Sequence, residues 1–162
     1  MSESKQKTYA YFWSVKDKDY GCFSQWYPAE FEEDGVVFSC TEQYMMAKKA
    51  LLFKDQPSYN KIIAENDPKK MKALGRKVKN FHPDTWAKER YSIVLCANML
   101  KFGYDTDLLD ILRSTGDAVI AEASPYDKIW GIGVRKKKGL TESGWKGLNL
   151  LGKALEEVRD SI

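Results

Sequence analysis

The pattern of apolar and polar positions along the chain predicts a protein built mainly from helices. Two of these helices have recognisable starts. Asp67-Pro68 places a capping carboxylate before a proline at the first helical position, and Ser39 with Glu42 matches a capping box. The expected helices run to about Phe53 from the Ser39 cap, from Pro68 through Lys77, from after Asp84 to Phe102, from about Asp105 to Ser114, and from about Trp145 to Asp160.

Strands are expected in only a few places. Residues 30–38 are typical of two short strands around the turn pair Asp34-Gly35. Val119–Ala121 is a further possible strand, with Trp130–Val134 as its expected partner. We therefore expect a mainly α fold with a small β element and no alternating βαβ units. It should be one domain over residues 9–162, after a flexible tail over residues 1–8.

The first helix carries two charged residues on an otherwise apolar stripe. Glu42, Met45, Met46, Lys49 and Leu52 follow helical spacing. A half-buried lysine loses hydration, its pKa falls, and the free amine becomes available as a nucleophile. The alternative is that Glu42 caps the helix and Lys49 extends to water, as charged residues at the edge of an apolar stripe often do.

A second set of polar groups lies in a short segment after the expected strand 119–121. Glu122, Ser124, Asp127, Trp130 and Gly131 occur within a dozen residues. Such loops often carry catalytic groups. The alternative is a turn in which Asp127 bonds its own backbone. The two glycines of Gly131-Ile-Gly133 are not followed by a helix, so the dinucleotide-binding fingerprint is absent.

The long helix expected from Asp84 places Trp86 and Arg90 on one face, with Lys101 further along. An indole beside a guanidinium can hold a base by stacking and a phosphate by a charge-assisted hydrogen bond. Equally, Trp86 can anchor the helix while Arg90 is a surface charge. Two basic runs, within 69–79 and 135–138, are typical of solvated faces or of a weak phosphate-binding surface.

Composition narrows the class of protein. Aromatic residues make up 13% of the chain, including five Trp and nine Tyr, and such rings build cores or stack on planar ligands. The net charge of +3 argues against strong binding of nucleic acid by bulk charge. No apolar run approaches the roughly 20 residues of a membrane helix, and the polar start has no signal core. Three widely spaced cysteines form neither a disulfide framework nor a metal site, so we expect a reducing, cytoplasmic setting.

Several blocks of sequence together resemble the NADAR (YbiA-like) family. They occur in the family's order over about residues 12–159, nearly the whole chain. The blocks are Phe23-Ser24-Gln-Trp26, Thr41-Glu42-Gln-Tyr44-Met-Met-Ala-Lys-Lys49, Trp86 with Arg90, Lys101-Phe102, Leu112–Gly116, Glu122-Ala-Ser124-Pro-Tyr-Asp127-Lys-Ile-Trp130-Gly131 and Gly147-Leu-Asn149-Leu-Leu-Gly152. One departure is Gln43, which stands where the family often has a histidine.

The resemblance implies a mainly helical fold and hydrolysis of N-glycosidic bonds, without a metal or other cofactor. The family lysine falls on Lys49 rather than Lys48, its glutamate on Glu42, and its Asp–x–x–Trp–Gly on Asp127, Trp130 and Gly131. Catalytic roles are then expected for Lys49, Glu42, Asp127 and Glu122. Contacts with substrate are expected from Phe23, Ser24, Trp26, Tyr44, Trp86, Arg90, Lys101, Ser124, Trp130, Gly131 and Asn149.

Family members are described on ADP-ribosylated guanine and on riboflavin-pathway ribosylaminopyrimidine phosphates. The expected partner is therefore a ribosyl or ADP-ribose-containing nucleotide, either free or within DNA or RNA. Two other classes remain open. One is a module that binds ADP-ribose-like ligands without turnover. The other is a helical interaction protein, which would tolerate Lys49→Met and Asp127→Asn.

Overall fold

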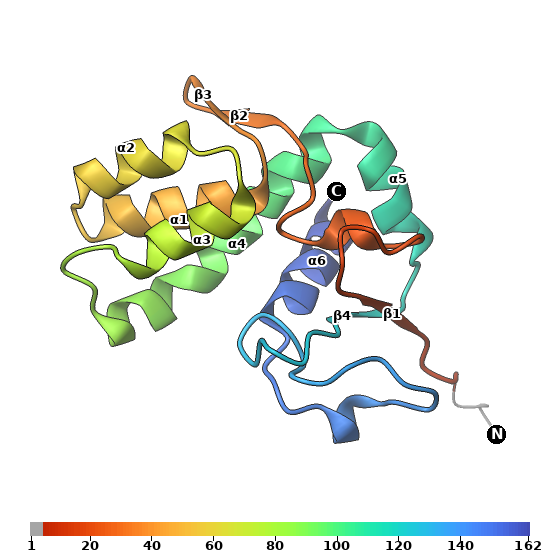
Figure 1. Ribbon diagram of the computed structural model, residues 1–162. Coiled ribbons are helices and arrows are strands. Elements are labelled where there is room, and N and C mark those ends of the chain that lie inside the picture. Colours follow the sequence, from red (N-terminus) through yellow and green to blue (C-terminus); the bar gives the residue numbers. More distant parts are fainter. Residues whose placement is uncertain (1–4) are drawn as a thin grey trace. The chain divides into compact units, whose positions relative to one another are not determined.

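Helices dominate the structure, which confirms the expected mainly α fold with a small β element. A computed structural model describes residues 5–162. Figure 1 follows the elements along the chain. They are β1 (Tyr9–Phe12), the short 3-10 helix η1 (Gly21–Phe23), β2 (Phe31–Glu33), β3 (Val36–Phe38), α1 (Thr41–Leu52), α2 (Gln56–Ala64), α3 (Pro68–Arg76), α4 (Pro83–Tyr104), α5 (Thr106–Ser114), β4 (Val119–Glu122), the 3-10 helix η2 (Glu142–Gly144) and α6 (Leu150–Ser161).

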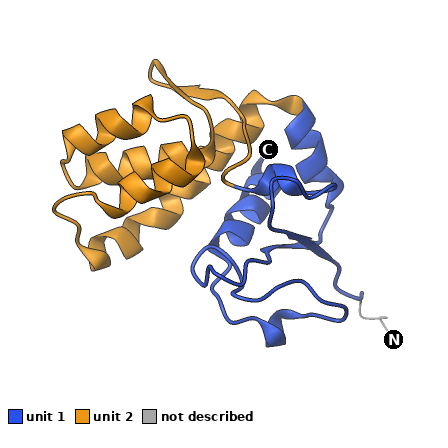
Figure 2. Ribbon diagram, viewed as in Figure 1, with its two compact units in different colours: residues 1–24, 107–162 blue, residues 25–106 orange. Residues whose placement is uncertain are grey.

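The chain divides into two compact units, shown in Figure 2. Unit 2 is the continuous stretch 25–106, and unit 1 combines the residues up to Ser24 with residues 107–162. The expected flexible tail, residues 1–8, lies partly outside the described residues, and β1 begins directly after it at Tyr9. Unit 1 is therefore assembled from both ends of the sequence.

Unit 2 begins with the predicted hairpin. Strands β2 and β3 pair antiparallel, with Phe31 opposite Phe38. Asp34 and Gly35 form the turn with φ of 51° and 83°, a backbone conformation that two-residue hairpins require. Both phenylalanines are buried, and their rings stack with centroids 5.7 Å apart. Helices α1–α4 follow the hairpin and complete unit 2.

Helix α1 forms where expected, but its start differs from the prediction. The N-cap is Cys40, which makes no side-chain cap hydrogen bond. The side chain of Gln43 reaches back instead, and its Oε1 accepts from the Ser39 amide at 2.8 Å and from the Ser39 hydroxyl at 3.1 Å. The expected capping box of Ser39 with Glu42 is therefore wrong, because the residue after Glu42 takes the capping position.

Helix α2 was not expected from the sequence. Asp55 caps it by accepting from the Ser58 amide at 3.1 Å, and Pro57 lies in its first turn. The same arrangement starts α3, where Asp67 accepts from the Lys69 amide at 2.9 Å, as predicted. Helix α4 agrees closely with its predicted bounds, and the single histidine of the chain, His82, is its cap.

In unit 1, β4 forms as predicted but with a different partner. It pairs parallel with β1, in a register that places Tyr9 opposite Val119 and Phe12 opposite Glu122. The expected partner, residues 130–134, is not a strand. It makes one backbone hydrogen bond to β4, from the Ile132 amide to the Glu122 carbonyl at 2.8 Å, and Gly133 then turns the chain away with a φ of +73°.

The last helix, α6, begins five residues later than predicted. Asn149 precedes it in the left-handed region, with φ of 53° and ψ of 43°. The amides of Asn149 and Leu150 donate instead to the carbonyls of Gly131 and Ile129, at 3.0 and 3.1 Å. They are therefore not available for the first turn of a helix that starts at residue 145.

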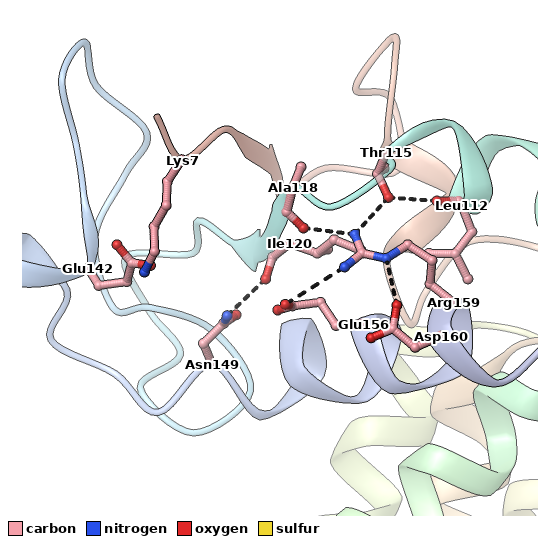
Figure 3. Close-up of polar contacts among 10 residues, drawn as sticks. All are labelled: Lys7, Leu112, Thr115, Ala118, Ile120, Glu142, Asn149, Glu156, Arg159 and Asp160. Carbon is pink, nitrogen blue, oxygen red and sulfur yellow. Dashed lines mark hydrogen bonds and ion pairs between the residues drawn. The ribbon is translucent and has the colours of Figure 1, made fainter. Parts of the chain in front are cut away.

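Arg159 ties α6 to the segment before β4, as Figure 3 shows. Its Nη1 donates to the Thr115 hydroxyl at 3.0 Å and to the Ala118 carbonyl at 2.7 Å. Its Nη2 lies 3.9 Å from the Glu156 carboxylate. The side chain is only 8% exposed, so these bonds form with little competition from water.

Candidate active site

Lys49 lies near the end of α1, with its amine against two aromatic rings. The Nζ atom is 4.7 Å from the ring centroid of Phe81 and 5.3 Å from that of Trp86. Burial lowers the pKa of Lys49, and the positive charge of Arg76 lowers it further, while the negative charge of Glu42 opposes both effects. More of the amine is therefore neutral at a given pH than in an ordinary lysine, which is the condition for nucleophilic attack.

The neighbouring Lys48 has a different environment. Its Nζ pairs with the Glu33 carboxylate at 2.5 Å and lies 5.1 Å from the ring centroid of Tyr44. Burial acts to raise the pKa of Glu33, but the hydrogen bonds from Lys48 and Tyr44 outweigh it, and the pKa is below its ordinary value. The Lys48–Glu33 pair is thus a stable ion pair, so the geometry favours Lys49 over Lys48 as the reactive amine.

Tyr44 belongs to the same polar cluster. Its hydroxyl donates to the Glu33 carboxylate at 2.8 Å and lies 3.2 Å from the sulfur of Cys96. Burial is the main reason that its pKa is raised well above the ordinary value. Tyr44 was expected to contact the substrate, and here its side chain is buried with its hydroxyl on Glu33.

Glu42 is buried at the first turn of α1, only 4% exposed. Its backbone amide donates to the Gln25 carbonyl at 3.0 Å, which fixes the start of the helix. The whole first half of α1 is buried, rather than one stripe of it. Its negative charge acts to raise the pKa of Lys49, against the larger effect of burial.

The other expected residues of unit 2 lie in varied surroundings. Trp86 provides one of the two rings beside Lys49. The Arg90 Nε atom is buried and has no hydrogen-bond partner among the described residues. Lys101, by contrast, is fully buried, with its amine over the rings of Tyr27 and Phe102. Trp26 is 38% exposed, as a stacking residue needs to be.

In unit 1, the loop after β4 forms a tight turn. The Ser124 hydroxyl accepts from the Tyr126 amide at 3.2 Å. The Asp127 Oδ1 atom accepts from the amides of Ile129 and Trp130 at 2.9 and 2.8 Å. The turn that the sequence allowed as an alternative is therefore present, and the second carboxylate oxygen of Asp127 takes no part in these two bonds.

Glu122 lies at the end of β4, against the backbone of Gly131. A Cβ on Gly131 would lie 2.8 Å from the Glu122 carbonyl and 3.2 Å from its carboxylate. Only glycine fits there, so the Trp130-Gly131 pair can approach Glu122 closely. Asn149 is buried, and its amide bonds both the Glu122 amide, at 3.2 Å, and the Ile120 carbonyl, at 2.9 Å. In this structure its side chain holds the end of β4 in place.

The expected site residues divide into two groups. Unit 2 holds Trp26, Glu42, Tyr44, Lys49, Trp86, Arg90 and Lys101, and unit 1 holds Phe23, Ser24, Glu122, Ser124, Asp127, Trp130, Gly131 and Asn149. Phe23, Ser24 and Trp130 are buried. Sequence reasoning missed Phe81 and the cluster around Glu33. Phe81 follows a loop and has no periodic neighbour, so nothing in the sequence marks it as a neighbour of Lys49.

Two general features bear on the chemistry. Over residues 5–162, no group of three or more His, Cys, Asp or Glu side chains is placed to hold a metal ion. In the same range, no helix has the length and apolar character needed to cross a bilayer.

The chain thus combines a mainly helical fold with a half-buried lysine of lowered pKa on α1 and, in unit 1, an Asp–x–x–Trp–Gly loop after β4. The chain belongs to the NADAR domain family, whose model matches residues 11–162. This confirms the resemblance seen in the sequence.

Individual relatives agree with this assignment. The chain is 46% identical over 145 residues to "N-glycosidase R617" of Acanthamoeba polyphaga mimivirus, covering 85% of each chain. It matches the NMR structure of the E. coli protein YbiA with a TM-score of 0.79 and 27% identity, over 97% of this chain and 86% of that one. It is also 29% identical to "Riboflavin biosynthesis protein PYRR, chloroplastic" of Zea mays, over 88% of this chain but 23% of that protein. The expectation of a glycosidase agrees with the first of these names.

Proposed function

We propose that this protein is an N-glycosidase that removes ADP-ribose from modified guanine, with Lys49 as the nucleophile. The observation that carries the proposal is the position of the Lys49 amine over Phe81 and Trp86, where burial lowers its pKa. Family membership and the name of the mimivirus relative support cleavage of an N-glycosidic bond.

The first step of the proposed reaction opens the sugar. A carboxylic acid, Asp127 or Glu122, gives a proton to the ribose ring oxygen, and the bond from that oxygen to C1 breaks. The neutral Lys49 amine then bonds to C1. The bond from C1 to the base nitrogen then breaks, the base takes a proton from the Lys49 nitrogen, and Lys49 and C1 remain joined as a Schiff base.

Water completes the cycle. It adds to C1, the bond from C1 to the Lys49 nitrogen breaks, and the sugar closes to free ADP-ribose. The net change is one water consumed and one base released. In this scheme Glu42 orients the Lys49 amine or moves its proton. Its negative charge also opposes the fall in the pKa of Lys49.

Other groups have binding roles in this scheme. The exposed Trp26 and the half-buried Trp86 are suited to stack on a base or adenine. Arg90, with its unpartnered Nε atom, is suited to the diphosphate. The phosphate-binding role of Lys101 stays a prediction, and its side chain is fully buried in this structure.

Borohydride trapping tests the lysine directly. Reduction during turnover of an ADP-ribosylated guanine substrate should attach one sugar to Lys49, located by mass spectrometry of the digested protein. Lys49→Ala should give no adduct, whereas Lys48→Ala should give the wild-type amount. A fully active enzyme that traps no sugar would exclude the Schiff base and favour direct attack by water between two carboxylates.

A second candidate substrate is a ribosylaminopyrimidine phosphate of the riboflavin pathway. The observation in its favour is the name of the Zea mays relative. A panel of ribosyl N-glycosides, assayed for release of the free base, separates the two substrates. Binding of ADP-ribose without release of base from any member of the panel would instead indicate a non-catalytic module.

A further inference from the structure

A pocket of about 440 Å³ lies in unit 1 and contains none of the site residues described above. Its volume is within the range of roughly 300–1,000 Å³ typical of small-molecule sites. The residues that line it come from β1, the loop after it, the residue after β4 and the segment after Gly133. They are Tyr9, Tyr11, Phe12, Trp13, Asp17, Lys18, Asp19, Tyr20, Ala123, Arg135 and Lys136.

Aromatic rings form much of the wall. Tyr9 and Tyr11 stack on each other with centroids 5.4 Å apart. Trp13 is 36% exposed, and the guanidinium carbon of Arg135 lies 5.1 Å from its ring centroid. Flat, partly exposed rings beside a guanidinium suit a planar ligand such as a nucleobase.

Among the described residues, the charge of Arg135 has no acidic partner. Within residues 5–162 its polar contact is the hydroxyl of Tyr126, at 3.5 Å, and it forms no ion pair. Lys136 and Lys18 add two positive charges to the lining. An exposed guanidinium over an indole is well placed to bind a phosphate.

The two carboxylates of the pocket only partly offset these charges. Asp17 is committed to the backbone, because its Oδ2 accepts from the amides of Trp13 and Ser14 at 2.6 and 3.0 Å. Asp19 remains as a second negative charge. The exposed Lys137 and Lys138 continue the positive charge beyond Lys136.

We propose that this pocket binds a nucleotide unit, with the base against Trp13 and the phosphate on Arg135 and Lys136. The ligand's source is either a free nucleotide or a single strand of nucleic acid, since both present the same base and phosphate. The site uses no residue of the Lys49 chemistry, so it does not depend on the proposed glycosidase activity.

Two probes without an ADP-ribosyl group test the proposal and distinguish a free nucleotide from a nucleic-acid strand. Adenosine monophosphate is measured by titration calorimetry, and a fluorescein-labelled thymidine octanucleotide by anisotropy at several salt concentrations. Binding of the mononucleotide alone assigns a free nucleotide. Tighter binding of the octanucleotide, weakened by salt, assigns a nucleic-acid strand.

Substitutions locate the bound probe. Trp13→Ala should weaken binding roughly 5- to 150-fold through lost stacking. Arg135→Gln should weaken it and, for the octanucleotide, reduce the slope of log affinity against log salt by about one. Lys136→Gln, which removes a second exposed positive charge from the lining, should also weaken binding. Lys153→Gln, an exposed lysine on α6 outside the pocket, and Lys49→Ala should both bind as the wild type does.

Three results would overturn the proposal. The first is that neither probe binds. The second is wild-type affinity in Trp13→Ala, Arg135→Gln and Lys136→Gln, each checked for folding by circular dichroism. The third is an equal loss of binding in Lys49→Ala, which would place the probe at the Lys49 site.

Discussion

The Lys49 amine lies 5.3 Å from the centroid of the Trp86 ring, while the amine of the preceding residue is held in an ion pair with Glu33. Two consecutive lysines on one helix therefore have opposite environments. The aromatic wall removes water from Lys49 and offers it no counter-charge at hydrogen-bond distance, whereas Lys48 is neutralised by a carboxylate. This contrast supplies matched controls for testing the proposed chemistry.

Replacing Lys49 by Met should abolish activity without unfolding the protein. Loss of a covalent nucleophile typically costs several orders of magnitude in kcat, and we expect at least about 10³-fold. Because burial lowers the pKa of Lys49 in the folded state, the charged lysine disfavours folding at any pH below that pKa, and this cost fades as pH rises toward the unfolded value. At pH 7, Lys49→Met should therefore melt at the same or a higher temperature.

Lys48→Met is the control for this test. It removes the ion pair with Glu33, so it should melt at a lower temperature and keep its activity. Wild-type rates of base release in Lys49→Met would contradict the nucleophilic role and favour direct attack by water.

Replacing Glu42 by Gln should change the pH dependence of the reaction. The negative charge of Glu42 acts to raise the pKa of Lys49, so its removal lowers that pKa further. The rise of kcat with pH, as Lys49 loses its proton, should then occur at lower pH than in the wild type. If Glu42 also moves protons, the plateau of kcat should fall roughly 10²–10⁴-fold.

The matched control is Glu32→Gln, on the exposed side of β2. It should leave the pH profile of kcat in place. A Glu42→Gln profile that moves to higher pH would show that the two side chains do not interact as inferred.

Two isosteric changes separate the candidate acids in unit 1. In Asp127→Asn, the amide oxygen can still accept from the amides of Ile129 and Trp130, so the turn should persist while the acid is lost. Glu122→Gln removes the other acid. We expect one of the two variants to lose roughly 10²–10⁴-fold in kcat, measured as base release. Full activity in both would exclude a carboxylic acid from this loop.

Gly131→Ala should disturb the loop that carries Asp127. The new Cβ would lie 2.8 Å from the Glu122 carbonyl and 2.9 Å from that of Asp127, both backbone atoms that cannot rotate away. We expect a loss of roughly 1–3 kcal/mol in the free energy of unfolding, together with reduced kcat. Gly103→Ala is the control, since its Cβ meets nothing within 4 Å inside α4. It should stabilise the protein by up to about 1 kcal/mol in a urea titration.

Arg159→Met should destabilise unit 1. It removes hydrogen bonds from a buried charged group to the Thr115 hydroxyl and the Ala118 carbonyl, each of a type that contributes about 1.5–3 kcal/mol. Arg113→Met removes bonds from an exposed arginine to the Ile162 carbonyl and should cost less than about 0.5 kcal/mol. Similar urea midpoints for the two variants would contradict this role of Arg159.

The sequence predicted the helices better than the strand pairing, for a physical reason. Helix starts are local signals, and Asp67-Pro68 marked α3 correctly. The same signal, Asp55 with Pro57, marks α2, although it was not recognised. The partner of β4 could not be found in this way, because Tyr9 pairs with Val119 far along the chain, and no local pattern specifies such a pair.

The candidate site was only partly accessible to sequence reasoning. Helical spacing marked Lys49 and Glu42 as candidate site residues. It did not reveal why the pKa of Lys49 is lowered, because Phe81, whose ring lies beside the amine, comes from a separate loop. For the segment after β4, the sequence was compatible with a catalytic loop or with a simple turn. The hydrogen bonds of Asp127 show that the turn is present. Asn149 was expected at the substrate, yet both ends of its amide bond the backbone of β4. Such roles depend on tertiary contacts, which the spacing of residues along the sequence does not reveal.

The pairing of β1 with β4 also has a consequence for synthesis on the ribosome. Val119 is made 110 residues after its partner Tyr9, which at about 5–20 residues per second is a delay of roughly 5–20 seconds. Throughout that interval the aromatic strand has no edge to join, and residues 25–106 are complete before Val119 is made. Nascent chains therefore pass through a stage in which the lysine-bearing half can be folded and the first strand is still exposed to chaperones or to neighbouring chains.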